Sequence, residues 1–192
     1  KIVKMGLKIE RSREQRTVKC VLHHIGDIPG GVGVSVANLG GRVLYEGTPI
    51  GKGAGDLYEV CKTAKVLTKA EASATTYEVA KGHHFKVGDR FATAECNGQE
   101  IASIDRTDEA KDIITVKTSL GKVVAAGACA FESKGADTKL KVTPIAVAGS
   151  DQDVNPGDNL FVSAWVVAVV REANAPAAND AIKSALKCVA YV

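Results

Sequence analysis

Short runs of β-branched and other apolar residues, separated by glycine, aspartate and proline, recur along almost the whole chain. Strands spaced at roughly 8–12 residues with turn residues between them are typical of a sandwich or barrel. Helical periodicity is nearly absent. We therefore predict an all-β or mainly β protein with strands in the ranges 17–22, 32–36, 42–46, 57–61, 75–79, 90–96, 101–105, 113–117, 123–131, 140–147, 160–170 and 188–192.

The range 160–170 is the most apolar part of the chain, with ten apolar residues out of eleven. A strand of this composition needs cover on both faces, so we place it at the centre of the core. Trp165 lies inside this range and is expected to pack in the core, with an anchor at a subunit interface as the alternative. Because the sequence has only four Phe, four Tyr and one Trp, we expect a core of Val, Ala, Ile and Leu.

One short helix is expected near the C-terminus. Asn179 is a suitable N-cap for a helix over 181–186. The polar range 106–112 separates two expected strands and predicts the tip of a long hairpin. The alanine-rich range 64–74 is either a helix or a linker. If the chain forms two lobes, we expect the boundary near 62–74.

Positive charge gathers in residues 1–16, which include Arg11, Arg13 and Arg16 and have no apolar run that could serve as a signal peptide. This segment is too charged to fold alone, so we predict a basic N-terminal arm before a β-rich domain over 17–192. An extended arm would present the three arginines as a basic edge to a carboxylate-bearing partner, or it is simply solvated. The net charge of +3 is too small to indicate nucleic acid. The longest apolar run is too short for a membrane helix, so a soluble protein is expected.

The cysteines are odd in number and scattered, with no Cys-x-x-Cys pair and no spacing typical of a metal site. This pattern predicts free thiols that act as small core residues in a protein folded in a reducing compartment. The five positions are Cys20, Cys61, Cys96, Cys129 and Cys188.

Two adjacent histidine pairs, His23-His24 and His83-His84, are candidates for a metal site. Neighbouring residues on a strand point to opposite faces, so neither pair can chelate as a unit. One histidine from each pair could meet the other in space, but the sequence suggests no third ligand. We expect these histidines to face solvent or to lie at the edge of the core, and we predict neither a metal nor a cofactor.

Two glycine-rich segments do not fit a phosphate-binding loop. The range 30–33 lacks the last glycine of a dinucleotide fingerprint and no helix follows it, and 51–53 lacks the Gly-Lys-Ser/Thr sequence. The range 151–159 resembles the opening of a calcium loop, but Val162 stands where a bidentate Glu is needed. We interpret it as a polar turn, with a weak calcium site of another type as the alternative.

The sequence contains no Gly-x-Ser-x-Gly motif and no cysteine in a protease context. Its acidic cluster falls at the expected hairpin tip, where carboxylates are solvated, whereas a general acid needs burial to raise its pKa. The cluster consists of Asp105, Asp108, Glu109 and Asp112. We therefore predict that the protein is not an enzyme, and an enzyme with an unfamiliar site ranks third among the alternatives.

The order of several short motifs resembles that of the head-fibre and capsid-decoration proteins of tailed phages. The segments that carry the resemblance are Gly-Thr-Pro-Ile-Gly at 47–51, Ala-Thr-Thr-Tyr-Glu-Val at 74–79 running into His-Phe-Lys-Val-Gly-Asp at 84–89, Ala-Gly-Ser at 148–150 followed by 164–170, and the short helix with its closing strand at 180–192. Together they span most of the chain from about residue 40 onward.

The resemblance implies a virion structural protein that binds the major capsid protein on the outside of a phage head and stabilises the shell, commonly as a trimer. It also implies assembly in the cytoplasm of a bacterial host, with no nucleic acid or membrane partner. Arg11, Arg13 and Arg16 are then the candidate capsid contacts. No long fibrous tail follows the compact part, so a decoration protein or the capsid-anchored base of a fibre is expected. A tail or baseplate component and a carbohydrate-binding β-module are the alternatives, although 5% aromatic residues weaken the latter.

Overall fold

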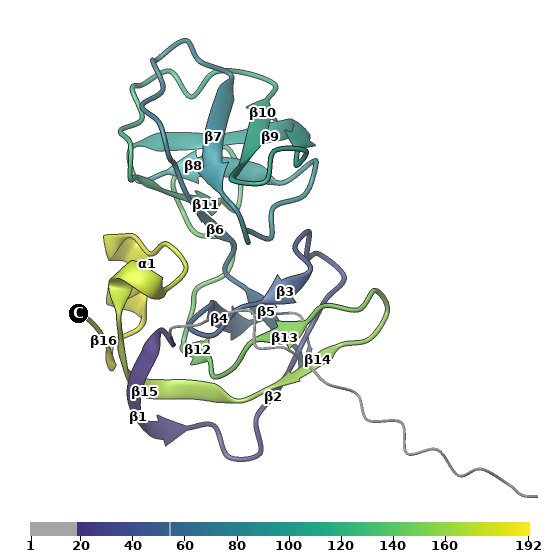
Figure 1. Ribbon diagram of the computed structural model, residues 1–192, viewed down its shortest axis with the longest axis vertical. Helices are drawn as coiled ribbons and strands as arrows, with labels where there is room; N and C mark the ends of the chain where they lie inside the picture. Colours follow the sequence, from purple (N-terminus) through teal and green to yellow (C-terminus); the bar gives the residue numbers. More distant parts are fainter. Residues whose placement is uncertain (1–18, 54) are drawn as a thin grey trace, which may run out of the picture.

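The computed structural model describes residues 19–53 and 55–192 and shows a mainly β protein, with 43% of residues in strands and 5% in helices. The predicted fold class is confirmed. Two curled sheets form half-barrels in two lobes, one built from the middle of the chain and one from the segments before and after it (Figure 1). The predicted basic arm over 1–16 lies outside the described residues.

The first sheet runs in the order β1-β15-β12-β4-β5-β2-β14, with β16 also paired to β15. Most neighbours are antiparallel, but β16 is parallel to β15 and β2 is parallel to β5. A separate two-stranded sheet joins β3 and β13. The bounds are β1 (Val21–Asp27), β2 (Val32–Val34), β3 (Val43–Leu44), β4 (Pro49–Lys52), β5 (Tyr58–Val60), β12 (Ala146–Ala148), β13 (Gln152–Asp153), β14 (Leu160–Val162), β15 (Ala164–Val170) and β16 (Val189–Tyr191).

The second sheet runs in the order β6-β11-β8-β9-β10-β7, and each adjacent pair is antiparallel. The chain enters it between Val60 and Thr63. Strands β9 and β10 form the predicted long hairpin. The bounds are β6 (Thr63–Lys65), β7 (Thr76–Ala80), β8 (Arg90–Thr93), β9 (Cys96–Asp105), β10 (Lys111–Val116) and β11 (Cys129–Glu132).

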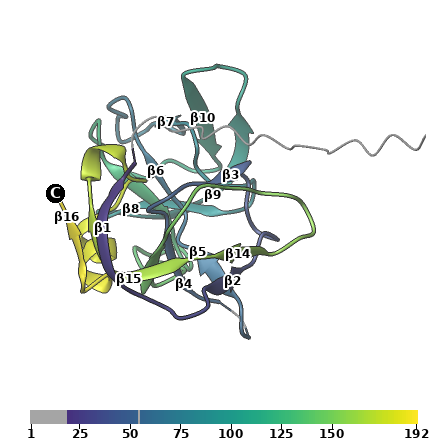
Figure 2. The same ribbon diagram turned by 60° about the horizontal axis from the view of Figure 1, so that its bottom comes forward.

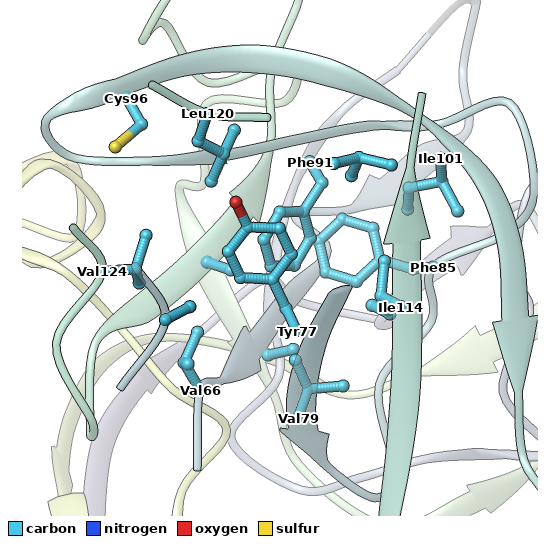
Figure 3. Packing of buried hydrophobic residues seen from close by; sticks show 14 residues of the cluster. Val66, Tyr77, Val79, Phe85, Phe91, Cys96, Ile101, Ile114, Leu120 and Val124 are labelled. Carbon is cyan, nitrogen blue, oxygen red and sulfur yellow. The ribbon is translucent and has the colours of Figure 1, made fainter. Parts of the chain in front are cut away.

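The fully buried aromatic side chains belong to the second lobe. Tyr77, Phe85 and Phe91 are fully buried, and the Phe91 ring lies 5.1 Å from Tyr77 and 5.6 Å from Phe85 between centroids (Figure 3). The core of the first sheet consists mainly of Val, Ala, Ile and Leu, as expected. The largest buried side chains therefore lie in the second lobe, and the placement of the core's centre at 160–170 is wrong.

The range 160–170 forms two strands, β14 and β15, which are separated at Ser163. Strand β14 lies at an edge of the sheet and follows ordinary alternation, with Leu160 and Val162 buried and Phe161 68% exposed. Trp165 is only half-buried. The prediction of one strand covered on both faces is therefore wrong. Apolar composition alone does not distinguish an edge strand such as β14 from a central strand.

The predicted C-terminal helix is confirmed. Helix α1 (Asp180–Ala185) begins where the Asn179 side chain accepts a hydrogen bond from the Ile182 amide at 2.9 Å. A 3₁₀ helix, η1 (Glu172–Asn174), precedes it. In the range 64–74 no helix forms: the chain continues β6 and then passes through turns.

Candidate functional site

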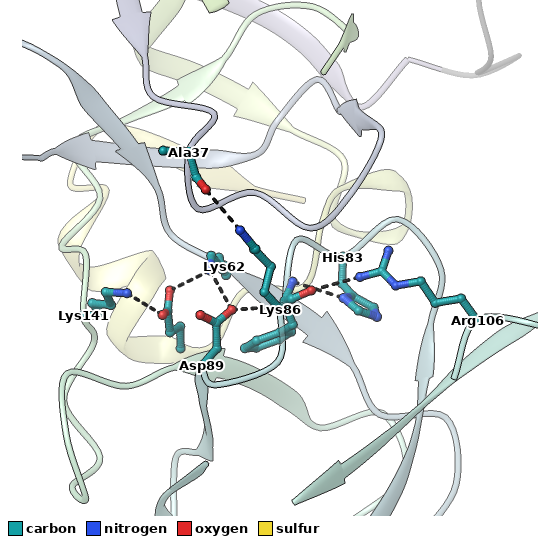
Figure 4. A network of polar contacts seen from close by, with 9 residues as sticks. Ala37, Lys62, His83, Lys86, Asp89, Arg106 and Lys141 are labelled. Atoms are coloured by element: carbon teal, nitrogen blue, oxygen red, sulfur yellow. Dashed lines mark hydrogen bonds and ion pairs between the residues drawn. The ribbon is translucent and has the colours of Figure 1, made fainter. Parts of the chain in front are cut away.

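A buried group of charged residues lies where the chain passes between the lobes (Figure 4). Lys62 follows β5, Asp89 directly precedes β8 and Glu132 ends β11. The Lys62 ammonium lies 2.6 Å from Asp89 Oδ2 and 3.4 Å from Glu132 Oε2. Lys141 contacts the other Glu132 oxygen at 2.6 Å. We call these four residues the Lys62 cluster.

Backbone pairing fixes the Lys62 cluster in place. The Glu132 amide donates to the Lys62 carbonyl at 3.0 Å, and the Lys141 amide donates to the Glu132 carbonyl at 3.0 Å. The side chains of Lys62 and Glu132 are 2% and 4% exposed. Burial raises the pKa of the Glu132 carboxyl, and the hydrogen bond from Lys141 opposes this rise. Removing one partner would leave a buried charge uncompensated, which costs about 3–5 kcal/mol in comparable sites.

A second polar group surrounds His83 in the same lobe. Its Nδ1 accepts from the Phe85 amide at 3.2 Å, and its Nε2 lies 3.1 Å from Asp112 Oδ2. Lys81 donates to the other Asp112 oxygen at 2.6 Å, and Arg106 donates to the Phe85 carbonyl at 2.9 Å. Burial lowers the pKa of His83 to about 4, and the Arg106 charge adds to this effect while Asp112 opposes it.

His84 lies at the contact between the two lobes. The Gly40 amide donates to the His84 carbonyl at 3.0 Å, and Lys86 Nζ donates to the Ala37 carbonyl at 3.1 Å. A Cβ on Gly41 would lie 2.8 Å from the His84 ring. Burial lowers the pKa of His84 to about 4, and the neighbouring His83 contributes. Both histidines are therefore neutral at neutral pH.

One sequence expectation about these groups is wrong, and another is only partly met. His83 and His84 are 3% and 4% exposed, so the solvent-facing alternative does not apply to them. Asp112 is 2% exposed, although the hairpin tip was expected to be solvated. The reason is tertiary, because Asp112 pairs across the sheet with Val79 at the start of β10, next to Lys81 and His83. The other pair, His23 and His24, is exposed as expected.

Two clefts open beside the junction. The first holds about 560 Å³ and is lined on both lobes by residues that include Tyr45, Lys65, Lys81, His83, Cys129 and Pro176. Burial raises the pKa of Cys129 to about 12, so its thiol stays protonated and is a poor nucleophile. The second holds about 710 Å³ and is lined by residues that include Leu39, Arg42, Lys86, Val154 and Pro156.

Within the described residues, no group of three or more His, Cys, Asp or Glu side chains could hold a metal ion. In the segment considered as a calcium loop, the Asp151 carboxylate accepts a hydrogen bond from the Glu46 amide at 2.6 Å and so organises the backbone. No disulfide joins the five cysteines in the part of the chain that the structure describes. That part also contains no helix with the length and hydrophobicity to cross a bilayer.

Strand β1 lies at the other edge of the first sheet, beside β15 (Figure 2). It carries exposed apolar side chains. Leu22 is 48% exposed and Ile25 is 76% exposed. The His24 ring stacks on the half-buried Trp165 of β15, with centroids 4.2 Å apart and an interplanar angle of 3°. We call these four residues the β1 surface. The expected strand at 17–22 suggested neither its exposure nor its extension to Asp27.

The predicted contact residues Arg11, Arg13 and Arg16 lie outside the described residues. The sequence did not reveal the Lys62 cluster. Around Lys62 the sequence shows only one lysine after two apolar residues, Val60 and Cys61. Exposed lysines often follow apolar residues in the same way, so this pattern does not predict a buried lysine.

Fold and site together define a two-lobed, mainly β protein with a buried polar junction and an exposed apolar edge strand. No family model, curated protein or solved structure matches the chain.

Proposed function

We propose that this protein is a non-enzymatic component of a tailed-phage virion that binds the outer surface of the capsid as a decoration or head-fibre protein. The major capsid protein is its partner, and its role is to stabilise the shell by bridging subunits. The observation that carries the proposal is the exposed apolar β1 surface, which follows the basic segment of residues 1–16 in the chain. Apolar anchors supply affinity at protein interfaces, while charged neighbours speed association.

A bridging protein must hold its shape under load, and the contact between the lobes supports that requirement. Hydrogen bonds from Gly40 and Lys86 join the loops of the two lobes, and the Lys62 cluster lies beside the point where the chain crosses. A preorganised surface loses less entropy on binding than a mobile one.

A trimer is the proposed assembly. Closed symmetry is the general rule for soluble homo-oligomers, and a trimer matches the three-fold positions of a capsid. Three linked copies of the β1 surface would also raise the overall affinity through multivalency. The Trp165 ring is covered on one face by His24, which makes it a poorer platform for a sugar than an open indole.

Co-sedimentation with mature capsids of the phage that encodes the protein tests the proposal. We expect full-length protein to pellet with undecorated capsids at low salt and to associate more slowly at high salt, since screening weakens charge steering. Reversing Arg11, Arg13 and Arg16 to Glu should slow association, and Ile25→Ser should weaken the final complex. Val123→Ser, at an exposed apolar position of the other lobe, is the matched control and should bind normally.

Protein that stays in the supernatant with undecorated capsids at low salt would show that capsid decoration is wrong. The tail or baseplate role and the carbohydrate-binding role would then be tested in its place.

A further inference from the structure

The Lys62 cluster holds an amine, a carboxyl group and a second carboxyl group in the arrangement that amide formation requires. Lys62 Nζ lies 2.6 Å from Asp89 Oδ2, and Glu132 Oε2 lies 3.4 Å from the same nitrogen. We propose that Lys62 and Asp89 react to form an intramolecular isopeptide bond, with Glu132 as the group that transfers protons. The proposal does not depend on the capsid role.

The two partners are held in contact and away from solvent. The Lys62 and Asp89 side chains are only 2% and 13% exposed, so few water molecules reach the reacting atoms. Transfer of one proton from the ammonium to the carboxylate gives a neutral amine and a carboxylic acid, which are the nucleophile and the electrophile. Glu132 is 4% exposed, and burial raises the pKa of its carboxyl, which makes the carboxylate a stronger base for the proton transfer.

The step balances without any co-reactant. The neutral Lys62 nitrogen attacks Asp89 Cγ and forms the new C–N bond, and Glu132 accepts one proton from that nitrogen. Glu132 then delivers this proton to the departing Asp89 hydroxyl, the C–O bond breaks and one water molecule leaves. Glu132 returns to its starting state, and the two buried charges have disappeared.

The surroundings assist the reaction at two points. The Lys86 amide donates to Asp89 Oδ2 at 2.7 Å, so it can stabilise negative charge on this oxygen while Oδ1 departs as water. Lys141 binds the other Glu132 oxygen at 2.6 Å and fixes the carboxyl beside Lys62. Lys62 directly precedes β6, Asp89 directly precedes β8 and Glu132 ends β11, so paired strands fix the backbone beside each reacting group. The reaction therefore gains the advantage of proximity over the same step in solution.

Mass spectrometry of the intact, full-length protein tests the proposal. We expect a mass below that of the sequence by one water molecule, about 18 Da, as for any condensation within a chain. Trypsin should fail to cut after Lys62, and fragmentation should identify a branched peptide that joins Lys62 to Asp89. A mass equal to that of the sequence after prolonged incubation of the folded protein would overturn the proposal, as would loss of water mapped elsewhere.

Variants separate the chemistry from the fold. Glu132→Gln keeps the size of the side chain but cannot relay a proton, so it should show the full sequence mass with an unchanged circular dichroism spectrum. Lys62→Arg should also retain the full mass. Lys111→Arg is the matched control, because Lys111 pairs with Glu78 on the same sheet but both side chains are about a third exposed. It should lose water as the wild type does; a folded Glu132→Gln variant that still forms the bond at the wild-type rate would exclude the role of Glu132.

Discussion

The two His-His dipeptides lie in opposite environments. His23 and His24 lie on the edge strand β1 and are exposed, while His83 and His84 lie in the loop that contacts the other lobe. Strand geometry places neighbouring side chains on opposite faces, but it does not say whether both faces are covered. Here residues 37–41 cover the loop from the other lobe, and both rings are buried.

Acid should destabilise the protein through His84. Its pKa is about 4 in the fold, below the ordinary value of 6.5, so between these values the unfolded chain binds more protons. The contribution of His84 to the free energy of unfolding is therefore fully present above pH 6.5. It is lost as the pH falls toward 4, and the loss amounts to about 3 kcal/mol. Lys62, Arg106 and His83 all disfavour the charged ring. Urea unfolding at several pH values measures the loss.

The His84→Gln variant should lose part of this dependence on pH, whatever its stability at pH 7.5. His23→Gln removes an exposed histidine and should leave the pH dependence as in the wild type. Equal slopes of unfolding free energy against pH in wild type and His84→Gln would contradict the assignment.

At the scale of elements, the contact between loops 37–41 and 82–87 requires glycine at position 40. A Cβ there would collide with the Phe85 carbonyl oxygen and would lie 2.9 Å from Lys86 Cγ. We expect Gly40→Ala to lower the free energy of unfolding by about 1–3 kcal/mol, the range typical of overpacking. Gly135→Ala is the control, because no atom lies within 4 Å of its added Cβ. Chemical denaturation of both variants compares them, and equal stability would show that the loops separate freely.

Helix α1 depends on its cap, because a helix of six residues leaves most of its backbone groups without internal partners. Asn179→Ala should cost about 1 kcal/mol, while Asn179→Asp should keep most of the wild-type stability. Loss of the cap should also weaken core packing, because α1 places Ile182 against the first sheet. Thermal unfolding measures it, and Asn155→Ala at an exposed loop position serves as the control. A destabilised Asn179→Asp variant would argue against the cap as the cause.

At the scale of the whole molecule, the proposed trimer predicts a mass of three chains of 20.0 kDa. The exposed apolar residues of β1 and β14 lie at the two ends of the first sheet, where pairing with another copy would cover them. Light scattering after size exclusion should give the trimer mass at micromolar concentration. A monomer mass at the highest soluble concentration would remove the trimer and leave capsid binding to be tested by itself.

The sequence by itself determined the features that depend on neighbouring residues. Alternation and turn residues predicted the mainly β fold and the β9–β10 hairpin, and the Asn179 cap predicted the single helix, since these signals act within a few positions. The partners across the sheets were decided only by the tertiary structure. Lys62 meets Asp89 from 27 positions away and Lys81 meets Asp112 from 31 positions away, so their burial follows from strand order. Strand order also explains the exposure of Phe161, because it places β14 at the edge of its sheet. Apolar composition alone does not show where in a sheet a strand lies.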